Sequence, residues 1–179
     1  NVDNRKMSKS LNNFFTVRDV AEQYGYEPIR YMLISSHYRS PINYNTEIIT
    51  QCKASLERLY NCYENVQFAK ENAPSGLKDS EKDIVEKFNA HRTEFVRAMD
   101  DDLNTADAIA AIFELARDIN TYTGASAQPS KELCEKAIGV FVELTDILGL
   151  VKKEQATSLD QEIEALIAKR TQARENKDW

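Results

Sequence analysis

Apolar residues recur in steps of three and four residues from Asn45 to Gly149. This spacing places them on one face of an α-helix, and short breaks divide the pattern into four runs. Helices joined by short loops pack as antiparallel neighbours. The pattern therefore predicts an antiparallel four-helix bundle over residues 45–150. The residues expected to face its core are Ile49, Cys52, Leu56, Leu59, Tyr63, Val66, Ile84, Phe88, His91, Phe95, Ala98, Ile109, Ile112, Ala116, Ile119, Leu133, Ala137, Val140, Leu144 and Ile147.

Polar residues and glycines mark where these helices begin and end. The sequence Ala-Pro-Ser-Gly at residues 73–76 ends the first helix. Short polar side chains accept hydrogen bonds from the free N–H groups at a helix start. The expected caps of the other three helices are Ser80, Asn104 with Asp107, and Ser130, and the expected stops of the last two are Gly124 and Gly149.

The first 44 residues predict a separate, short helical subdomain. Residues 1–15 lack a helical period and are expected to form an exposed loop. Thr16 and Asp19 then have the spacing of a capping box at the start of a short helix. A second short helix has Pro28 in its first turn, where proline is tolerated, and residues 37–45 are expected to run extended.

The remaining residues, 151–179, predict a linker and the start of a C-terminal helix. Residues 151–157 are polar and unpatterned, and Ser158 with Gln161 has the spacing of a further capping box. The helical pattern is still running at Trp179 without a stop signal. We therefore expect three units, residues 1–44, 45–150 and 151–179, in an excerpt of a longer protein.

Composition indicates a folded protein without a membrane span. Hydrophobic residues make up 42% of the chain and charged residues 29%, as in ordinary globular proteins. The sequence has neither an apolar stretch long enough to cross a membrane nor a secretion leader, so we expect a cytoplasmic location. The formal net charge of −6 argues against indiscriminate binding to polyanions. Any contact with nucleic acid is therefore expected to be local.

Neither cysteines nor histidines predict a metal site. Cys52, Cys62 and Cys134 are an odd set without a close pair, and are expected to be reduced, partly buried thiols. His37 and His91 are too far apart in sequence to suggest a shared metal ion, and His91 is expected to be a hydrogen-bonded core residue. The run Asp100, Asp101 and Asp102 is expected to form a polar turn between two helices.

One short motif indicates chemistry: Lys-Met-Ser-Lys-Ser at residues 6–10. Two ammonium groups three residues apart, with serine hydroxyls between and after them, are suited to surround a triphosphate. Lysine acts there as a mobile point charge. The alternative for the same residues is a solvated basic turn without a ligand.

This motif and its surroundings resemble the cysteinyl-tRNA synthetases, a family of class I aminoacyl-tRNA synthetases. Residues 6–11 followed by 13–19 are similar to the family's second signature. The run Ser-Ser-His-Tyr-Arg-Ser-Pro at residues 35–41 narrows the resemblance to the cysteine enzyme and its close relatives. Residues 101–105 resemble the family's helical tRNA-binding domain, and residues 163–179 the helix that leads to its anticodon-recognition tail.

Asn12 departs from the family pattern, which usually has glycine after the leucine. Glycine at this position suggests a positive φ, and asparagine is the residue that next best tolerates it. We therefore expect a stiffer loop with its function retained.

The resemblance implies a ligase that joins cysteine to ATP as cysteinyl-adenylate and then transfers it to tRNA(Cys). By the family pattern, Lys9 and Lys6 are the expected catalytic residues, and Lys9, Ser8 and Ser10 the expected contacts to the ATP phosphates. The nucleotide-binding fold and the zinc site of the family are expected to lie outside this chain. The chain alone is therefore expected to be inactive, and the enzyme to be a monomer.

Basic residues of the N-terminal unit are candidates for contact with tRNA, because arginine matches phosphate oxygens bidentately. The candidates are Arg18, Arg30, Tyr38 and Arg39. The alternative is that they form internal salt bridges to neighbours such as Asp19 and Glu22. A basic cluster in the last unit has the same two interpretations, RNA contact or a solvated helix end: Lys169, Arg170, Arg174 and Lys177.

Two other functions remain open at this point. A cysteine-activating paralogue passes cysteine to the amine of a sugar-like acceptor, and is expected to lack a full tRNA-binding bundle. A purely structural helical interaction module would explain the bundle but leaves the lysine motif without a role.

Overall fold

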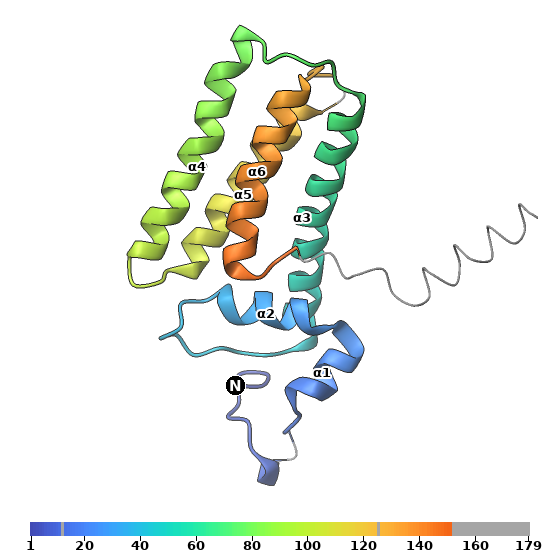
Figure 1. The fold of residues 1–179 in the computed structure, drawn as a ribbon. Helices are drawn as coiled ribbons and strands as arrows, with labels where there is room; N and C mark the ends of the chain where they lie inside the picture. The colour runs from blue at the N-terminus through green and yellow to red at the C-terminus, as the bar shows by residue number, and fades with distance from the viewer. Residues whose placement is uncertain (12, 125, 152–179) are drawn as a thin grey trace, which may run out of the picture.

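The computed structural model describes residues 1–11, 13–124 and 126–151, and its regular structure is helical (Figure 1). A mainly-α chain was the sequence prediction, and it is confirmed. The α-helices are α1 (Val17–Tyr24), α2 (Tyr26–Ile34), α3 (Thr46–Asn72), α4 (Lys82–Asp100), α5 (Thr105–Thr123) and α6 (Lys131–Leu148). Two short 3₁₀ turns span Lys9–Leu11 and Asp79–Glu81. Asn12 and the predicted C-terminal helix from Ser158 lie outside the described residues.

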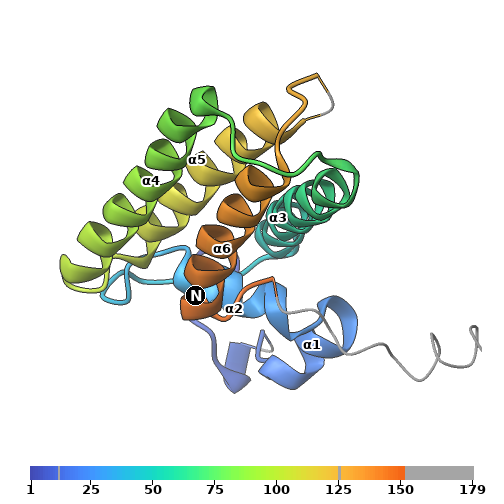
Figure 2. The same cartoon turned by 45° about the horizontal axis from the view of Figure 1, so that its top comes forward.

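Helices α3 to α6 form a bundle in which successive helices run in opposite directions (Figures 1 and 2). Helix α4 packs against α5, and α3 packs against both α6 and α5. Helices α1 and α2 lie at the end of the bundle where α3 begins, and α2 packs against α3. The four-helix bundle predicted from the apolar spacing is therefore confirmed.

The core of the bundle consists of aromatic and aliphatic side chains from all four helices. Phe88, Phe95 and Phe141 are fully buried, together with aliphatic residues from α3, α5 and α6. Most of the predicted core positions are buried or packed against this core. Ile147 is a wrong prediction, since its side chain is 57% exposed while Leu148 is buried. A step of four from Leu144, rather than three, keeps α6 in register with the core at its end.

The three cysteines are free thiols in this core, and they are more deeply buried than the partial burial that the sequence predicted. Burial raises the pKa of the Cys62 thiol to about 12, because an apolar environment disfavours the charged thiolate. Cys62 donates a weak hydrogen bond to the Ala116 carbonyl at 3.6 Å. These thiols are therefore inert packing residues at neutral pH.

Most predicted helix caps are present. The Thr16 hydroxyl accepts from the Asp19 N–H, and the Asp19 carboxylate accepts from the Thr16 N–H, which completes the capping box. Asn104 and Ser130 cap α5 and α6 through their side chains. Ser80 is a wrong prediction, because it lies inside the 3₁₀ turn that leads into α4.

Glu81, next to Ser80, connects the segment before α4 to the start of α6. Its side chain is buried and accepts hydrogen bonds from the Lys78 N–H at 2.9 Å, the Ser130 N–H at 2.8 Å and the Ser130 hydroxyl at 2.6 Å. The α3–α4 connection is thereby tied to the start of α6. Burial alone would raise the pKa of Glu81, but the hydrogen bonds from Ser130 and Lys78 outweigh it, so the pKa lies below the usual value.

The N-terminal part is more ordered than the sequence predicted. Residues 1–15 were expected to form an exposed loop, but Val2 is buried and bridges to Arg5 and to Tyr44. Residues 37–45 were expected to be extended throughout, but the Ser40 N–H donates to the His37 carbonyl and closes a turn. Contacts of these two kinds could not be predicted, because short polar segments have no apolar periodicity from which to infer them.

One apolar cluster joins the N-terminal helices to the bundle. Val20 of α1 and Ile29, Tyr31 and Met32 of α2 belong to the same buried cluster as the bundle core. The expected boundary between units at residue 44 therefore stays a prediction. None of the described helices is long and apolar enough to cross a membrane.

The substitution Glu81→Gln is predicted to lower the free energy of unfolding by about 1 to 3 kcal/mol at pH 7, because an amide leaves one buried Ser130 donor without an acceptor. The lowered pKa means that the carboxylate stabilises the fold above pH 4.5, and that this contribution is lost as the pH falls through its folded-state value. The difference between the variant and wild type should therefore shrink in acid. Urea unfolding at several pH values measures it, with the exposed Glu86→Gln as control. Equal stability of Glu81→Gln and wild type at pH 7 would contradict this role.

Candidate functional site

The lysine motif forms a compact, solvent-facing loop. Lys6 and Lys9 are exposed, and Lys9 begins the 3₁₀ turn Lys9–Leu11. The Ser8 hydroxyl accepts from the Leu11 N–H at 3.3 Å and lies 3.2 Å from the Ser10 hydroxyl. Lys9 and both serine hydroxyls thus belong to one tight turn, and Lys6 lies in the segment directly before it. The structure brings the hydroxyls of Ser8 and Ser10 together, and the role of the four side chains at a triphosphate stays a prediction.

Asn13 holds the base of this loop. Its side-chain oxygen accepts from the Ser8 N–H at 2.9 Å, and its amide nitrogen donates to the Lys6 carbonyl at 3.1 Å. One amide therefore bonds to the backbone on both sides of Met7. The ammonium of Lys9 lies 5.4 Å from the centre of the Phe14 ring, within the range of a cation–π interaction.

The segment that leads into the loop is anchored to the residues before α3. The Asp3 N–H donates to the Tyr44 carbonyl at 3.1 Å, and the Asn4 N–H donates to the Asn43 side chain at 2.8 Å. The rings of Phe15, which follows the loop, and Tyr44 are 4.6 Å apart. Both ends of the loop therefore meet at residues 43 and 44, directly before the start of α3.

Tyr38 and Arg39 are joined to Asp102 of the turn between α4 and α5. The Tyr38 hydroxyl donates to the Asp102 carboxylate at 2.8 Å, and the Arg39 guanidinium lies 3.1 Å from it. His37 lies 3.7 Å from the same carboxylate. The hydrogen bond to Asp102 raises the pKa of Tyr38, because it stabilises the protonated phenol. Internal pairing was one of the two expectations for these residues, and its partner is Asp102 rather than Asp19 or Glu22.

The other two basic candidates lie on the N-terminal helices. Arg18 is exposed on α1, and Arg30 is exposed on α2. The Arg30 guanidinium lies against Gly149, where an added Cβ would be 3.0 Å from Nη1. Gly149 has a positive φ of 66°, so glycine suits both its backbone and this close approach. Arg30 thus contacts the end of α6 from the N-terminal unit.

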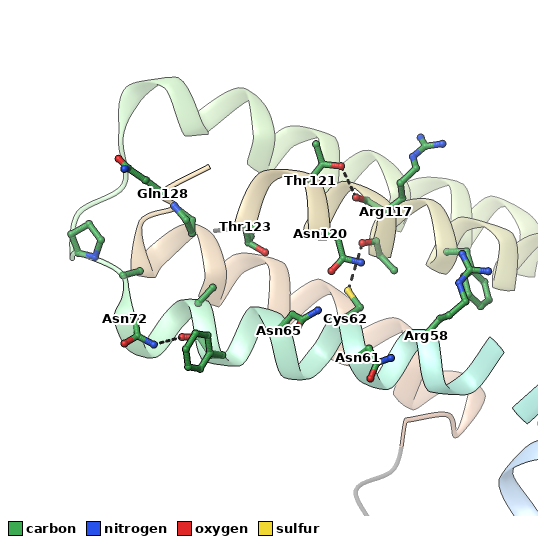
Figure 3. Close-up of a pocket in the computed structure, with 18 of the residues that line it drawn as sticks. Arg58, Asn61, Cys62, Asn65, Asn72, Arg117, Asn120, Thr121, Thr123 and Gln128 are labelled. Carbon is green, nitrogen blue, oxygen red and sulfur yellow. Dashed lines mark hydrogen bonds between the residues drawn. The ribbon is translucent and has the colours of Figure 1, made fainter. Parts of the chain in front are cut away.

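A groove of about 1320 Å³ runs between α3 and α5 (Figure 3). Asn61 and Asn65 project from α3 and Asn120 and Arg117 from α5, while the buried Cys62 forms part of its floor. The groove continues to the loops at the far end of the bundle, where Gln128 lies. No pattern in the sequence predicted this groove.

The histidines have structural partners. His91 bonds to the Asp118 carboxylate at 2.9 Å, which links α4 to α5 and confirms the predicted hydrogen bond. The predicted core position is wrong, because the His91 side chain is only partly buried and lies outside the apolar cluster. Among residues 1–11, 13–124 and 126–151, no group of three histidine, cysteine or acidic side chains has the arrangement of a metal site.

Comparison with known proteins identifies the family. Residues 1–54 match the family model of the class I (C) tRNA synthetase catalytic domain, and residues 94–152 match that of the DALR domain. Over its whole length the chain is 45% identical to a cysteine--tRNA ligase of Clostridioides difficile (strain 630). The chain belongs to the cysteinyl-tRNA synthetase family. It spans 38% of the length of that relative.

A solved structure supports the fold assignment alone. The agnB2 LeuRS of Agrobacterium radiobacter K84, crystallised in a ternary complex with tRNA and LeuAMS, aligns with 84% of this chain at a TM-score of 0.59. The aligned part is 22% of that LeuRS, and the sequence identity is 19%. The helical arrangement of this cysteinyl-tRNA synthetase chain is therefore shared with another synthetase.

Two features of the site had no clear signal in the sequence. Asn13 stood inside the family signature, but its role as a clamp depends on the turn that brings it back to Lys6 and Ser8. Asp102 was expected to be a turn residue, and its contacts span more than sixty positions to Tyr38. The groove was missed as well, although the spacing of Asn61 and Asn65, one helical turn apart, could have indicated a polar stripe on α3.

Replacing Asn13 with alanine is predicted to loosen the loop. Losing the bonds to Ser8 and Lys6 removes about 1 kcal/mol, which corresponds to a roughly fivefold larger open population. Limited trypsin digestion after Lys6 and Lys9 should therefore proceed roughly fivefold faster, as followed by mass spectrometry. Asn89→Ala, on the exposed face of α4, is the matched control. An unchanged cleavage rate in Asn13→Ala would rule out the clamp.

Proposed function

We propose that this chain forms part of a cysteine--tRNA ligase. The complete protein activates cysteine with ATP to give cysteinyl-adenylate and pyrophosphate, and then transfers the cysteinyl group to tRNA(Cys). The observation that carries this proposal is the 45% identity to a cysteine--tRNA ligase over the whole chain. The part proposed for residues 1–44 is to present the lysine loop and to contact the tRNA stem, and the part proposed for residues 45–150 is to bind tRNA.

Lys9 is the residue we propose to stabilise the leaving pyrophosphate. In the activation step an oxygen of the cysteine carboxylate bonds to the α-phosphorus of ATP, and the bond from that phosphorus to the bridging oxygen of pyrophosphate breaks. Negative charge grows on the leaving group. A lysine positioned there is more strongly attracted in the transition state than in the ground state, so it accelerates the reaction.

The neighbouring side chains complete the proposed phosphate site. Lys6 is exposed on the same loop and adds a second positive charge. Ser8 and Ser10 lie side by side, so their hydroxyls can donate to adjacent phosphate oxygens. The Asn13 clamp supports this role because it restrains the backbone that carries Lys6 and Ser8.

We propose that tRNA is contacted by the N-terminal unit through Arg18 and Arg30, which are exposed. Tyr38 and Arg39 are also proposed contacts, but each would exchange its bond to Asp102 for one to RNA. A complete bundle favours tRNA over the sugar-like acceptor of a paralogue. The exposed lysine loop likewise favours an enzyme over a purely structural module.

The zinc ion expected in this family does not fit the described side chains. A thiol must ionise to bind zinc, and burial raises the pKa of the thiols of Cys52, Cys62 and Cys134. We therefore propose that zinc, if the complete protein holds it, has its ligands outside this chain. A reducing, cytoplasmic location is proposed because the three thiols are free. A monomeric state stays a prediction.

Lys9→Ala in the complete protein is predicted to slow ATP–pyrophosphate exchange by roughly a hundredfold to a thousandfold, because one donor to the developing charge is lost. Binding of tRNA, measured by filter retention, should change by less than about twofold, since the effect of one exposed lysine outside the RNA surface is small. Lys53→Ala, exposed on α3, is the control. ATP–pyrophosphate exchange at the wild-type rate in Lys9→Ala would show that Lys9 does not contribute to the activation step.

A further inference from the structure

The groove between α3 and α5 differs in charge from two other hollows on the bundle. A hollow of about 500 Å³ on the other side of α3 is lined by Glu27, Glu64 and Glu71. Another, of about 360 Å³ between α4 and α5, contains four carboxylates. None of the described residues that line the α3–α5 groove is a carboxylate, although the whole chain has a net charge of −6. A polyanion therefore meets less repulsion in this groove than in either of those two hollows.

Three asparagines in the groove have unused hydrogen-bonding capacity. The side chains of Asn61, Asn65 and Asn120 make no hydrogen bond within the part of the chain that the structure describes. Each amide offers two N–H donors and one acceptor oxygen. A side-chain amide can pair with the edge of an unpaired base through its N–H group and its oxygen together. Three such amides in one groove therefore suit a ligand on which hydrogen-bond donors and acceptors alternate.

Positive charge in the groove comes from both walls. The Arg58 guanidinium lies 5.0 Å from the centre of the Phe113 ring, which holds it across the groove. Arg117 of α5 lines the groove and is paired with Glu114 and Asp118 on its own helix, and its side chain is directed away from α3 in Figure 3. The Arg117 side chain is itself 67% exposed and such pairs contribute little, so a rotation of the guanidinium toward a phosphate costs little. Lys78 adds a third cation at the loop end, where it donates to the Gln128 carbonyl.

Phe68 provides an exposed aromatic face at the edge of the groove. Its side chain is 70% exposed, which is unusual for a phenylalanine on a bundle helix. It stands on the ridge of α3 between this groove and the acidic hollow behind it. An exposed ring that lines the same groove as amides and arginines matches the surfaces on which unpaired RNA bases stack.

We propose that the α3–α5 groove binds unpaired nucleotides of an RNA loop. Phe68 stacks on a base, Asn61, Asn65 and Asn120 read base edges or ribose hydroxyls, and Arg58 with Arg117 neutralises phosphates. This inference rests on the proposed function in that the RNA is the tRNA of that reaction. A paired stem is a poorer occupant because its bases are stacked on one another and cannot reach Phe68. An acidic peptide would leave the three amides largely unused.

Fluorescence anisotropy with this 179-residue chain tests the proposal. The probes are a labelled RNA hairpin with an unpaired loop and a fully paired RNA duplex of the same length. The chain should bind the hairpin at least about tenfold more tightly, since stacking of one base on an aromatic ring contributes roughly that much. Phe68→Ala and Asn65→Ala should weaken hairpin binding by about tenfold and about fivefold.

Two matched controls lie on the exposed surface of α4. Val96→Ala removes an exposed apolar side chain and Asn89→Ala an exposed amide, and both should bind the hairpin within about twofold of wild type. Arg58→Ala should reduce the slope of log affinity against log salt by about one, which is the signature of one lost phosphate contact. Thermal unfolding of each variant checks that the bundle remains folded.

Wild-type hairpin affinity in both Phe68→Ala and Asn65→Ala would overturn the proposal. So would equal affinity for the duplex, or displacement of the hairpin from the groove by a poly-glutamate peptide at equal concentration. None of these outcomes affects pyrophosphate exchange in Lys9→Ala, so failure of the groove and failure of the proposed reaction are distinguishable.

Discussion

The buried face of α3 is the interaction on which the rest of the structure depends. Along one helix, Ile49, Leu59 and Val66 are fully buried and pack against the bundle, while the start of the same helix packs against α2. The lysine loop is tied to Tyr44 just before α3, and the amide groove lies along its second half. At a rise of about 1.5 Å per residue, Asn65 lies roughly 30 Å from Asn45 along the axis. A single rigid helix thus sets the distance between a proposed phosphate site and a proposed RNA site.

Two further ties keep the N-terminal unit in place on the bundle. The Asp102 carboxylate accepts a hydrogen bond from the Tyr38 hydroxyl and pairs with the Arg39 guanidinium. The Glu27 carboxylate accepts hydrogen bonds from the Tyr60 hydroxyl on α3 and from the Val151 N–H at the end of the bundle. Both carboxylates connect segments that are distant in sequence. Because these bonds are partly exposed, each is individually modest, and the apolar cluster that joins α2 to α3 contributes most of the cohesion.

The sequence predicted the bundle well because apolar periodicity and capping are local signals. Asn104 and Ser130 cap the helices that were expected, and the motif at residues 6–10 forms one loop. What could not be predicted depends on partners far along the chain. Glu81 looks like any acidic residue near a helix start until Ser130 is placed beside it, and Phe68 looks like one more apolar residue until its ring proves to be exposed. Grooves arise from how helices pack, which a single periodic pattern does not specify.

Hydroxyl-radical footprinting of this chain with and without tRNA(Cys) most directly tests whether α3 carries the RNA surface. Oxidation of Phe68 and Phe113 should fall when tRNA is added, because both rings line the groove. Val96 on α4 and Leu103 in the α4–α5 turn, which are also exposed, should be oxidised as before. Protection of Val96 with unchanged oxidation of Phe68 would contradict the account, since the RNA would then lie on the opposite face of the bundle.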